Sequence, residues 1–182
     1  MEIKEKNVTL KNGKAALIRP LMMEDAPTAL ALLQQAPAEL PYLLREPGEM
    51  KEDSVHEVHM IGEHSDSPNH IQLGAFLDGE LVGMVTLERM GEYRKIRHRG
   101  KFSILLKKAA WGVGLGKSMM SAIIEAAPTI EIDQIELRCM SSNQRAIGLY
   151  EKMGFRTWGI LPRANRRTNG CTEDETCMVL AL

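Results

Sequence analysis

Hydrophobic and polar positions along the chain predict several short strands, and two pairs of them form hairpins. Apolar, β-branched runs flank Asn12-Gly13 and Asp78-Gly79, and these dipeptides tolerate the positive φ of tight hairpin turns. The paired runs are therefore expected to be antiparallel neighbours. Further strands are expected at 101–106, at 135–140, around 155–162 and at the C-terminal end, TCMVLAL.

Helical patterns occupy much of the remaining chain. An Ala- and Leu-rich stretch at 24–35 and a polar stretch at 51–64 predict helices, whereas three prolines between 37 and 48 predict a loop. From Leu115 to Ala126, apolar residues recur at helical spacing. Hairpins followed by alternating strands and helices indicate one α/β domain over residues 1–182, with a mixed sheet.

Composition narrows the class of protein. The 182 residues include 23 Lys and Arg against 24 Asp and Glu, for a net charge of -1, and 44% are hydrophobic. A nucleic-acid-binding domain carries a basic surplus and a disordered chain has less apolar content, so neither class fits. The N-terminus lacks the apolar core of a signal peptide, and no run approaches the roughly 18 apolar residues of a membrane span. The three cysteines form no CxxC pair and are expected to be reduced, which favours a cytoplasmic protein.

A glycine-rich segment, WGVGLGKS at 111–118, lies between a predicted strand and a predicted helix. A Walker A loop requires glycine at position 111, where this chain has Trp. A GxGxxG fingerprint that starts at Gly112 would end on Lys117, and the other possible start fails in the same way. A strand, a tight turn and a helix N-terminus remain, and the free N–H groups there favour an anion such as a pyrophosphate. A simple strand-to-helix turn is also compatible with the segment.

A second motif, SSNQRAIGLYEKMGF at 141–155, predicts a short helix with polar chemistry on one face. Asn143 is a suitable N-cap residue, and Gly154 suits the position after the C-cap. Asn143 and Tyr150 are seven residues apart, so they lie on the same face, about 10 Å apart along the axis. Gly148 inside the helix costs roughly 1 kcal/mol relative to Ala, which suggests close packing against a neighbour.

These motifs resemble the GNAT superfamily of acyl-CoA-dependent N-acetyltransferases over about residues 71–182. The turn from Trp111 to Gly116 is similar to the family's pyrophosphate loop, although Trp stands where Arg or Gln is usual. The segment from Asn143 to Phe155 is similar to the family's second motif almost without departure. The segment from Gly170 to Met178 resembles the closing hairpin of bacterial members. The resemblance is strong because three motifs occur in the correct order.

The resemblance implies a single α/β domain whose mixed, mostly antiparallel sheet is flanked by helices and splayed between two strands, here 101–106 and 135–140. Acetyl-CoA would lie in that opening as co-substrate. The implied cofactor contacts come from a strand, the turn and one helix residue: Ile104, Leu105, Leu106, Trp111, Gly112, Val113, Gly114, Leu115, Gly116, Lys117 and Asn143. The apolar strand residues would suit any buried strand, and helix capping alone would explain Asn143.

Tyr150 matches the family's general acid, which protonates the departing CoA thiolate. The thiol pKa should be near 8.5 and the ordinary tyrosine pKa is about 10, so a tyrosine held close can donate to the sulfur. A tyrosine at the edge of the core is the alternative interpretation. His98, just before the cofactor strand, titrates near neutrality and is the best candidate base in the sequence, with a surface or structural histidine as its alternative. Many relatives carry Glu where this chain has Lys101, so a glutamate base is not carried over.

Other candidates for chemistry are weaker. His56, His59 and His64 do not match HExxH spacing, so no metal is expected. Cys139 lies among apolar residues on a predicted strand, where a cysteine is usually inert. The basic run YRKIRHRGK at 93–101 is expected to be a solvated loop and strand edge. Acidic residues that could attract a cationic acceptor gather in the 37–69 region: Glu39, Glu46, Glu49, Glu52, Asp53 and Glu57.

The sequence therefore predicts an acetyl-CoA-dependent N-acetyltransferase that acts by direct transfer in a ternary complex. The acceptor is a primary amine, either of a small molecule, for which the 37–69 region would close a pocket, or of a protein N-terminus, which needs an open groove. The competing hypothesis is a non-catalytic acyl-CoA-binding sensor or regulator on the same fold. No nucleic-acid or membrane partner is expected, and a homodimer is implied only by the resemblance.

Overall fold

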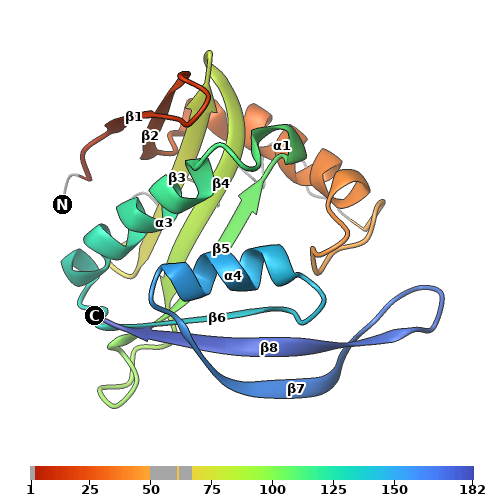
Figure 1. The fold of residues 1–182 in the computed structure, drawn as a ribbon. Helices are drawn as coiled ribbons and strands as arrows, with labels where there is room; N and C mark the ends of the chain where they lie inside the picture. The colour runs from red at the N-terminus through yellow and green to blue at the C-terminus, as the bar shows by residue number, and fades with distance from the viewer. Residues whose placement is uncertain (1–2, 50–60, 62–66) are drawn as a thin grey trace.

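Eight strands make one mixed sheet in the part of the chain that the structure describes, residues 3–49, 61 and 67–182 (Figure 1). In this computed structural model their order across the sheet is β1-β2-β3-β4-β5-β6-β8-β7. Their bounds are β1 Lys6–Thr9, β2 Ala15–Pro20, β3 His70–Leu77, β4 Glu80–Arg89, β5 Arg99–Leu106, β6 Gln134–Met140, β7 Arg156–Arg166 and β8 Thr172–Ala181. The helices are α1 Ala26–Glu39, α3 Leu115–Ala126 and α4 Gln144–Lys152. The predicted α/β fold with a mixed sheet is confirmed.

The sheet opens between β5 and β6. These strands run parallel, and they are bonded only where Arg99–Lys101 faces Gln134–Glu136. Beyond this short contact β5 continues to pair with β4 as far as Leu106, while β6 pairs with β8 along its whole length. The two strands therefore diverge, which confirms the predicted opening and leaves one edge of β5 facing a gap.

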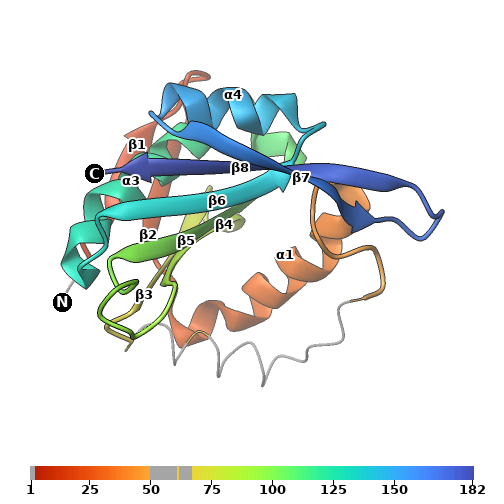
Figure 2. The ribbon, with the colours of Figure 1, turned by 90° about the horizontal axis from the view of Figure 1, so that it is seen from below.

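Helices cover both faces of the sheet. Figure 2 shows α3 and α4 on one face and α1 on the other. Four side chains of α3 are completely buried, and each stabilises the fold by about 1.5–3 kcal/mol relative to exposure: Leu115, Met119, Met120 and Ile123. The helical spacing that predicted α3 thus marks its core face. Among the described residues, none of the helices combines the length and the apolar composition needed to cross a membrane.

A partly buried ion pair anchors α1 to the sheet. Asp25, directly before the helix, accepts hydrogen bonds from both terminal nitrogens of Arg19 on β2, at 2.6 and 2.8 Å, and from the Met22 N–H. Burial alone would raise the pKa of the Asp25 carboxyl, but these hydrogen bonds outweigh burial and lower the pKa. Because α1 forms one wall of the site described below, this pair fixes that wall to β2.

Both predicted hairpins form, but their turns differ. Asp78 and Gly79 have φ of 50° and 82°, as a primed two-residue turn requires. In the first hairpin, Gly13 has a φ of 81° whereas Asn12 does not enter the positive region. The Leu10 N–H bonds to the Lys14 carbonyl at 2.8 Å, so this loop is longer, with glycine in its left-handed position. The tight primed turn expected there was wrong.

The helix α1 extends into the region predicted to be a loop. It passes Pro37 and ends at Glu39, so the expected loop was wrong for its first residues. Proline removes one backbone hydrogen bond from a helix, and near the last turn the helix tolerates that loss. The helix predicted at 51–64 lies outside the described residues except for Ile61, which is buried.

Candidate active site

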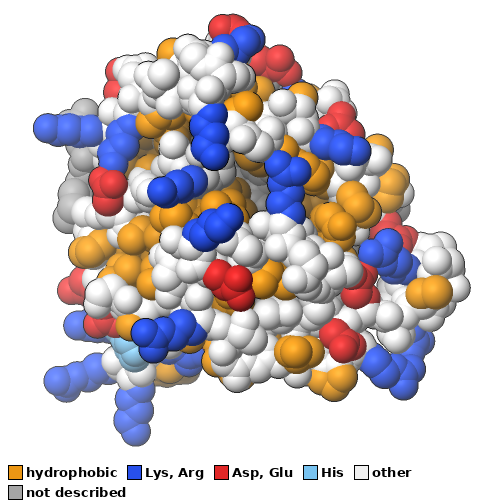
Figure 3. Space-filling view, in the orientation of Figure 1, with side chains coloured by type: hydrophobic (Ala, Val, Ile, Leu, Met, Phe, Trp, Pro, Cys, Tyr) orange, Lys and Arg blue, Asp and Glu red, His pale blue; other side chains and the backbone are white. Residues whose placement is uncertain are grey.

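A cavity of about 1420 Å³ occupies the opening of the sheet. Its lining includes Gly116 and Tyr150, from the helices on one face, and Leu33 and Pro37, from α1 on the other face. We call these two parts the α3–α4 side and the α1 side. In Figure 3 the hollow has apolar side chains at its base and Lys and Arg side chains around it. The opening of the sheet therefore connects two binding surfaces.

The glycine-rich turn forms an anion-binding surface at the start of α3. Gly112 and Gly114 have φ of 80° and 93°, in the left-handed region that favours glycine. The Ser118 N–H donates to the Gly114 carbonyl, so the N–H groups of 115–117 have no acceptor within the helix. The first turn of α3 carries no acidic residue. These donors and the helix dipole attract a negative group such as a phosphate.

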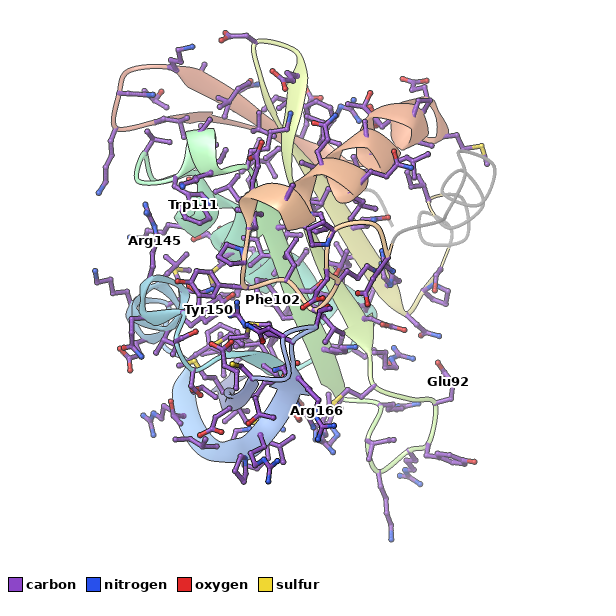
Figure 4. The ribbon with its side chains drawn as sticks, turned by 90° about the vertical axis from the view of Figure 1, so that its right-hand side faces the viewer. Glu92, Phe102, Trp111, Arg145, Tyr150 and Arg166 are labelled. Carbon is purple, nitrogen blue, oxygen red and sulfur yellow. The ribbon has the colours of Figure 1, made fainter. Side chains whose placement is uncertain are left out.

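Trp111 and Arg145 join this turn to α4. The indole N–H of Trp111 donates to the Leu106 carbonyl at 2.8 Å, which holds the ring at the end of β5. The guanidinium carbon of Arg145 lies 4.8 Å from the ring centre, a cation–π contact visible in Figure 4. A Cβ added at Gly112 would lie 3.4 Å from an Arg145 nitrogen. Arg145 was not predicted as a site residue, although its position two residues after the N-cap was an available signal.

Lys11 reaches the same turn from the β1–β2 hairpin. Its backbone N–H donates to the Val113 carbonyl at 2.9 Å, and its side chain passes Gly114, 3.8 Å from where a Cβ would lie. Nothing in the local sequence predicts this contact, because it joins distant parts of the chain. Four cations line this part of the cavity and favour a polyanionic ligand: Lys11, Lys117, Arg145 and Lys152.

Tyr150 extends from α4 into the opening of the sheet. Its ring centre lies 6.2 Å from that of Phe102 on β5 and 6.0 Å from that of Phe155, and Figure 4 shows it beside Phe102. This aromatic packing fixes the ring. Burial, with a smaller effect from Cys139, raises the pKa of the Tyr150 hydroxyl above its ordinary value. The hydroxyl therefore stays protonated across physiological pH and can donate a hydrogen bond.

Most of the predicted site residues line the cavity. Together with Tyr150, the structure gathers there Ile104, Leu105, Leu106, Trp111, Gly112, Gly114, Gly116, Lys117 and Asn143. Asn143 also caps α4, as predicted, by accepting from the Ala146 N–H at 3.2 Å. Val113 and Leu115 are not part of the lining, and the Leu115 side chain is fully buried in the core. Their predicted contacts use backbone groups and stay predictions.

His98 does not reach the cavity. Its carbonyl accepts the N–H groups of Asp133 and Gln134, at 3.1 and 3.2 Å, where β5 and β6 begin to pair. The β5 residues that line the cavity start at Lys101 and continue away from His98. The position of His98 therefore does not support its role as a base. Nearness to β5 in sequence does not reveal which end of the strand is open.

Cys139 lines the cavity as an inert thiol. Its S–H donates to the Thr176 carbonyl, with sulfur and oxygen 3.9 Å apart. Burial, followed by the charges of Glu175 and Cys177, raises the pKa of Cys139 to about 11. The thiolate is therefore scarce at neutral pH, which disfavours a nucleophilic role.

Metal ligands do not gather in the described part of the chain, where no three His, Cys, Asp or Glu side chains come together as a ligand set. The histidines considered from the sequence lie outside the described residues: His56, His59 and His64.

The α1 side has a different wall. Thr86 and Ser103 face each other on β4 and β5, with their hydroxyl oxygens 2.5 Å apart. Lys101 and Arg138 add positive charge on the two sides of the opening. None of these four was predicted as a site residue. The period-two alternation of the three strands was an available signal only for which residues of each strand share a face. Much of the remaining wall is apolar: Leu33, Leu40, Leu43, Met84, Met90 and Trp158.

A contact joins two distant loops beside the α1 side. Glu46, in the loop after α1, accepts hydrogen bonds from the Thr168 hydroxyl and from the Thr168 N–H, the latter at 3.1 Å. Thr168 lies in the turn between β7 and β8, toward which the loop after α1 extends in Figure 2. These bonds lower the pKa of Glu46. The carboxylate of Glu46 is therefore already hydrogen-bonded to Thr168. Three other acidic residues that were predicted to attract a cation lie outside the described residues: Glu52, Asp53 and Glu57.

The split mixed sheet, the anion-binding turn and the buried tyrosine together define the class of acyltransferase folds that the motifs predicted. A model of the acetyltransferase (GNAT) family matches residues 32–155, and the chain belongs to this family. The chain is 32% identical to the L-amino acid N-acetyltransferase AaaT of Escherichia coli over 52% of this chain and 59% of that protein. It is 30% identical to the spermine/spermidine N(1)-acetyltransferase of Bacillus subtilis, over 49% of this chain and 61% of that protein. The chain thus spans about three fifths of each curated relative.

Solved structures extend the likeness over nearly the whole chain. The acetyltransferase of the GNAT family from Streptococcus pneumoniae superposes with a TM-score of 0.87 and 27% identity, covering 92% of this chain and 99% of that chain. YncA from Salmonella typhimurium, whose structure holds its cofactor acetyl-CoA, gives a TM-score of 0.80 and 19% identity, with 91% and 92% coverage. The second likeness concerns the fold alone.

Proposed function

We propose that the protein transfers the acetyl group of acetyl-CoA to the primary amine of a small molecule. One observation carries the proposal above all. Tyr150, protonated and held in the opening of the sheet, lies between an anion-binding surface and a separate, largely apolar wall. A phosphate-bearing acyl donor and an amine can therefore meet beside a hydrogen-bond donor.

Acetyl-CoA fits the α3–α4 side. The backbone N–H groups from Val113 to Lys117 bind its pyrophosphate, and Lys11 and Arg145 add positive charge to that end. The edge of β5 at Ile104–Leu106, which β6 does not cover, pairs with the pantetheine arm and brings the thioester toward Tyr150. The likeness of fold to YncA with acetyl-CoA supports this placement.

The transfer needs one new bond and one broken bond. The amine nitrogen attacks the thioester carbon, the N–C bond forms and the C–S bond breaks; nitrogen loses a proton and sulfur gains one. Tyr150 donates its hydroxyl hydrogen to the sulfur as the C–S bond breaks, which stabilises the departing thiolate. The amine attacks in its unprotonated form, and the proton that it loses passes to solvent. No side chain is assigned as the base, and His98 is not carried forward.

A small acceptor is favoured because two loops beside the α1 side are tied to each other. A polypeptide needs a groove that is open along its length, whereas the contact of Glu46 with Thr168 spans from the loop after α1 to the β7–β8 turn. Relatives named for L-amino acids and for spermine or spermidine also support a small amine.

Direct transfer in a ternary complex is supported by the setting of Cys139, whose S–H is bonded to the Thr176 carbonyl. A ping-pong route needs an acetylated nucleophile, and the raised pKa of this thiol disfavours that role. The three cysteines are free, which supports a cytoplasmic location. The location and a homodimer stay predictions.

The test is acetyl-CoA consumption across a panel of small amines, followed by mass spectrometry of the product. We expect release of free CoA thiol in step with formation of one acetylated amine. Acetyl-CoA binding without turnover on any amine would contradict the proposal and favour a non-catalytic acyl-CoA-binding sensor.

A further inference from the structure

The charged groups on the α1 side indicate which kind of amine it receives. Phe102 on β5 packs beneath α4, so the alternation of a strand places Lys101 and Ser103 on the opposite, α1 face. On β6, Leu137 belongs to the core beneath α3 and α4, so Arg138 also faces α1. Lys101, Ser103 and Arg138 all line the cavity, and they stand on the two sides of its opening.

The acidic groups near these cations are already engaged. Glu136 accepts two hydrogen bonds from Arg99, one of them at 2.8 Å, and another from Gln134. The Arg99 hydrogen bonds lower the pKa of Glu136, with a smaller contribution from the charge of Arg138. Glu136 thus stays ionised, but its single negative charge is outweighed by the two positive charges of Arg99 and Arg138.

Lys101 and Arg138 are cations with exposed side chains. Within the described ranges, neither makes an ion pair or a hydrogen bond. Glu88 lies opposite Lys101 in the β4–β5 register, yet it forms no ion pair with it there and does not line the cavity. Glu175 on β8 is the other acidic residue of the lining, and it accepts a hydrogen bond from Asn165 at 3.3 Å. The two cations without an ion pair, Lys101 and Arg138, therefore outnumber it on this side.

A hydroxyl pair adds a neutral donor to these cations. Thr86 and Ser103 share one hydrogen bond, with 2.5 Å between their oxygens. One hydroxyl donates and the other accepts, so the accepting hydroxyl keeps its own hydrogen for a ligand. An anionic group placed here would receive two charge-assisted contacts and one from a hydroxyl.

We propose that the acceptor carries an anionic group beside its amine, as an α-amino acid does, and that Arg138, Lys101 and the hydroxyl pair bind that group. This inference rests on the proposed acetyl transfer. Ser103 directly precedes Ile104, so an anion at this point holds a neighbouring amine close to the thioester. The apolar wall receives the rest of the acceptor, which favours an amino acid with an apolar side chain. A polyamine, which needs acidic partners, is disfavoured.

The experiment compares acceptors that differ only in the carboxylate: phenylalanine with phenethylamine, and leucine with 3-methylbutylamine, with spermidine as a third kind of acceptor. For the wild type we expect kcat/KM to be at least about tenfold higher for each amino acid than for its decarboxylated partner, since charge-assisted contacts are the stronger hydrogen bonds. Arg138→Gln and Lys101→Gln should each raise KM for the amino acid about fivefold or more and leave KM for phenethylamine unchanged.

The matched controls are Arg156→Gln and Lys95→Gln, each of which removes one positive charge outside the cavity. All four variants should bind acetyl-CoA as the wild type does. Equal use of both members of a pair, preference for spermidine, or a preference that survives both cavity substitutions would overturn the inference. The proposed acetyl transfer itself would be contradicted by a different result, in which no CoA thiol is released with any of the acceptors.

Discussion

The two sides of the cavity are built by different means. On the α3–α4 side the anion-binding surface is made of backbone, with Gly112 and Gly114 in left-handed conformations and a helix N-terminus behind them. On the α1 side the wall is made of side chains from strands and loops that are distant in sequence. A substitution on the α1 side can change the acceptor without moving the backbone that receives acetyl-CoA. One fold can therefore keep its donor and exchange its acceptor.

Tyr150→Phe should break the transfer while leaving both sides intact. The Phe ring keeps the packing against Phe102 and Phe155, and only the hydroxyl is lost. We expect kcat to fall by about 10²-fold or more, with the acetyl-CoA Kd changed less than about twofold. Steady-state kinetics and calorimetry measure the two quantities, with the exposed Tyr93→Phe as control. An unchanged kcat would remove Tyr150 from the reaction.

The same tyrosine makes a prediction about pH. Its raised pKa means that the protonated form persists as the pH rises through about 10, where an ordinary tyrosine ionises. The kcat of the wild type should therefore show no decline from tyrosine ionisation up to pH 10. A kcat profile with a saturating acceptor checks this, and a fall near pH 9–10 that Tyr150→Phe abolishes would contradict it.

Gly114→Ala should damage the α3–α4 side alone. A φ of 93° costs a residue with a Cβ about 1–2 kcal/mol, and the added methyl group obstructs the approach of a phosphate to the turn. We expect the acetyl-CoA Kd to rise about tenfold, while the KM ratio between two acceptors stays constant. Gly170→Ala is the matched control, because it has a φ of 82° in the β7–β8 turn. A rise in Kd as large as this in the control would show that general strain is responsible.

Arg145→Gln tests the side chain that closes over the turn. A cation–π contact at a partly exposed site contributes about 0.5–1 kcal/mol, so the acetyl-CoA Kd should rise about three- to fivefold. The KM of the acceptor should not change. Arg156→Gln removes an arginine outside the cavity and serves as the comparison in the same titration. Equal affinities for all three proteins would separate Arg145 from the cofactor.

Glu46→Gln and Thr168→Val test the contact between the two loops beside the α1 side, and their expected effect is the smallest. Each removes part of the contact between the loop after α1 and the β7–β8 turn. We expect KM for a small acceptor to rise about two- to threefold, as for one or two exposed hydrogen bonds, with the acetyl-CoA Kd unchanged. Acetylation of a peptide N-terminus by the wild type, as fast as that of a small amine, would contradict a closed acceptor side.

Much of the fold was predictable because its signals are local. The Asp78-Gly79 turn, the caps of α4 at Asn143 and Gly154, and the core face of α3 each depend on residues close together in sequence. The glycine-rich turn before α3 and the position of Tyr150 on α4 also have local signals, whereas their roles toward acetyl-CoA were implied by the family resemblance and stay predictions. Two local features were not predicted: the longer loop at Gly13 and the continuation of α1 past Pro37. In both places the same residues are compatible with more than one backbone conformation.

The parts of the site that escaped prediction depend on contacts between distant segments. Lys11 meets the turn through a bond to Val113, and Glu46 meets Thr168 of the β7–β8 turn. His98 was placed by its nearness to β5 in sequence, but the sheet opens at the other end of that strand. The sequence shows that residues 101 and 138 are basic. It does not show that Lys101 and Arg138 share a face, because that depends on their strands lying on either side of the opening.

Initial rates over a grid of acetyl-CoA and amine concentrations test most directly whether the two sides of the cavity hold their substrates at the same time. Intersecting double-reciprocal lines are expected, with no acetylated protein after incubation with acetyl-CoA alone. Parallel lines, together with an acetyl group found on the chain in the absence of amine, would contradict direct transfer across the opening between β5 and β6.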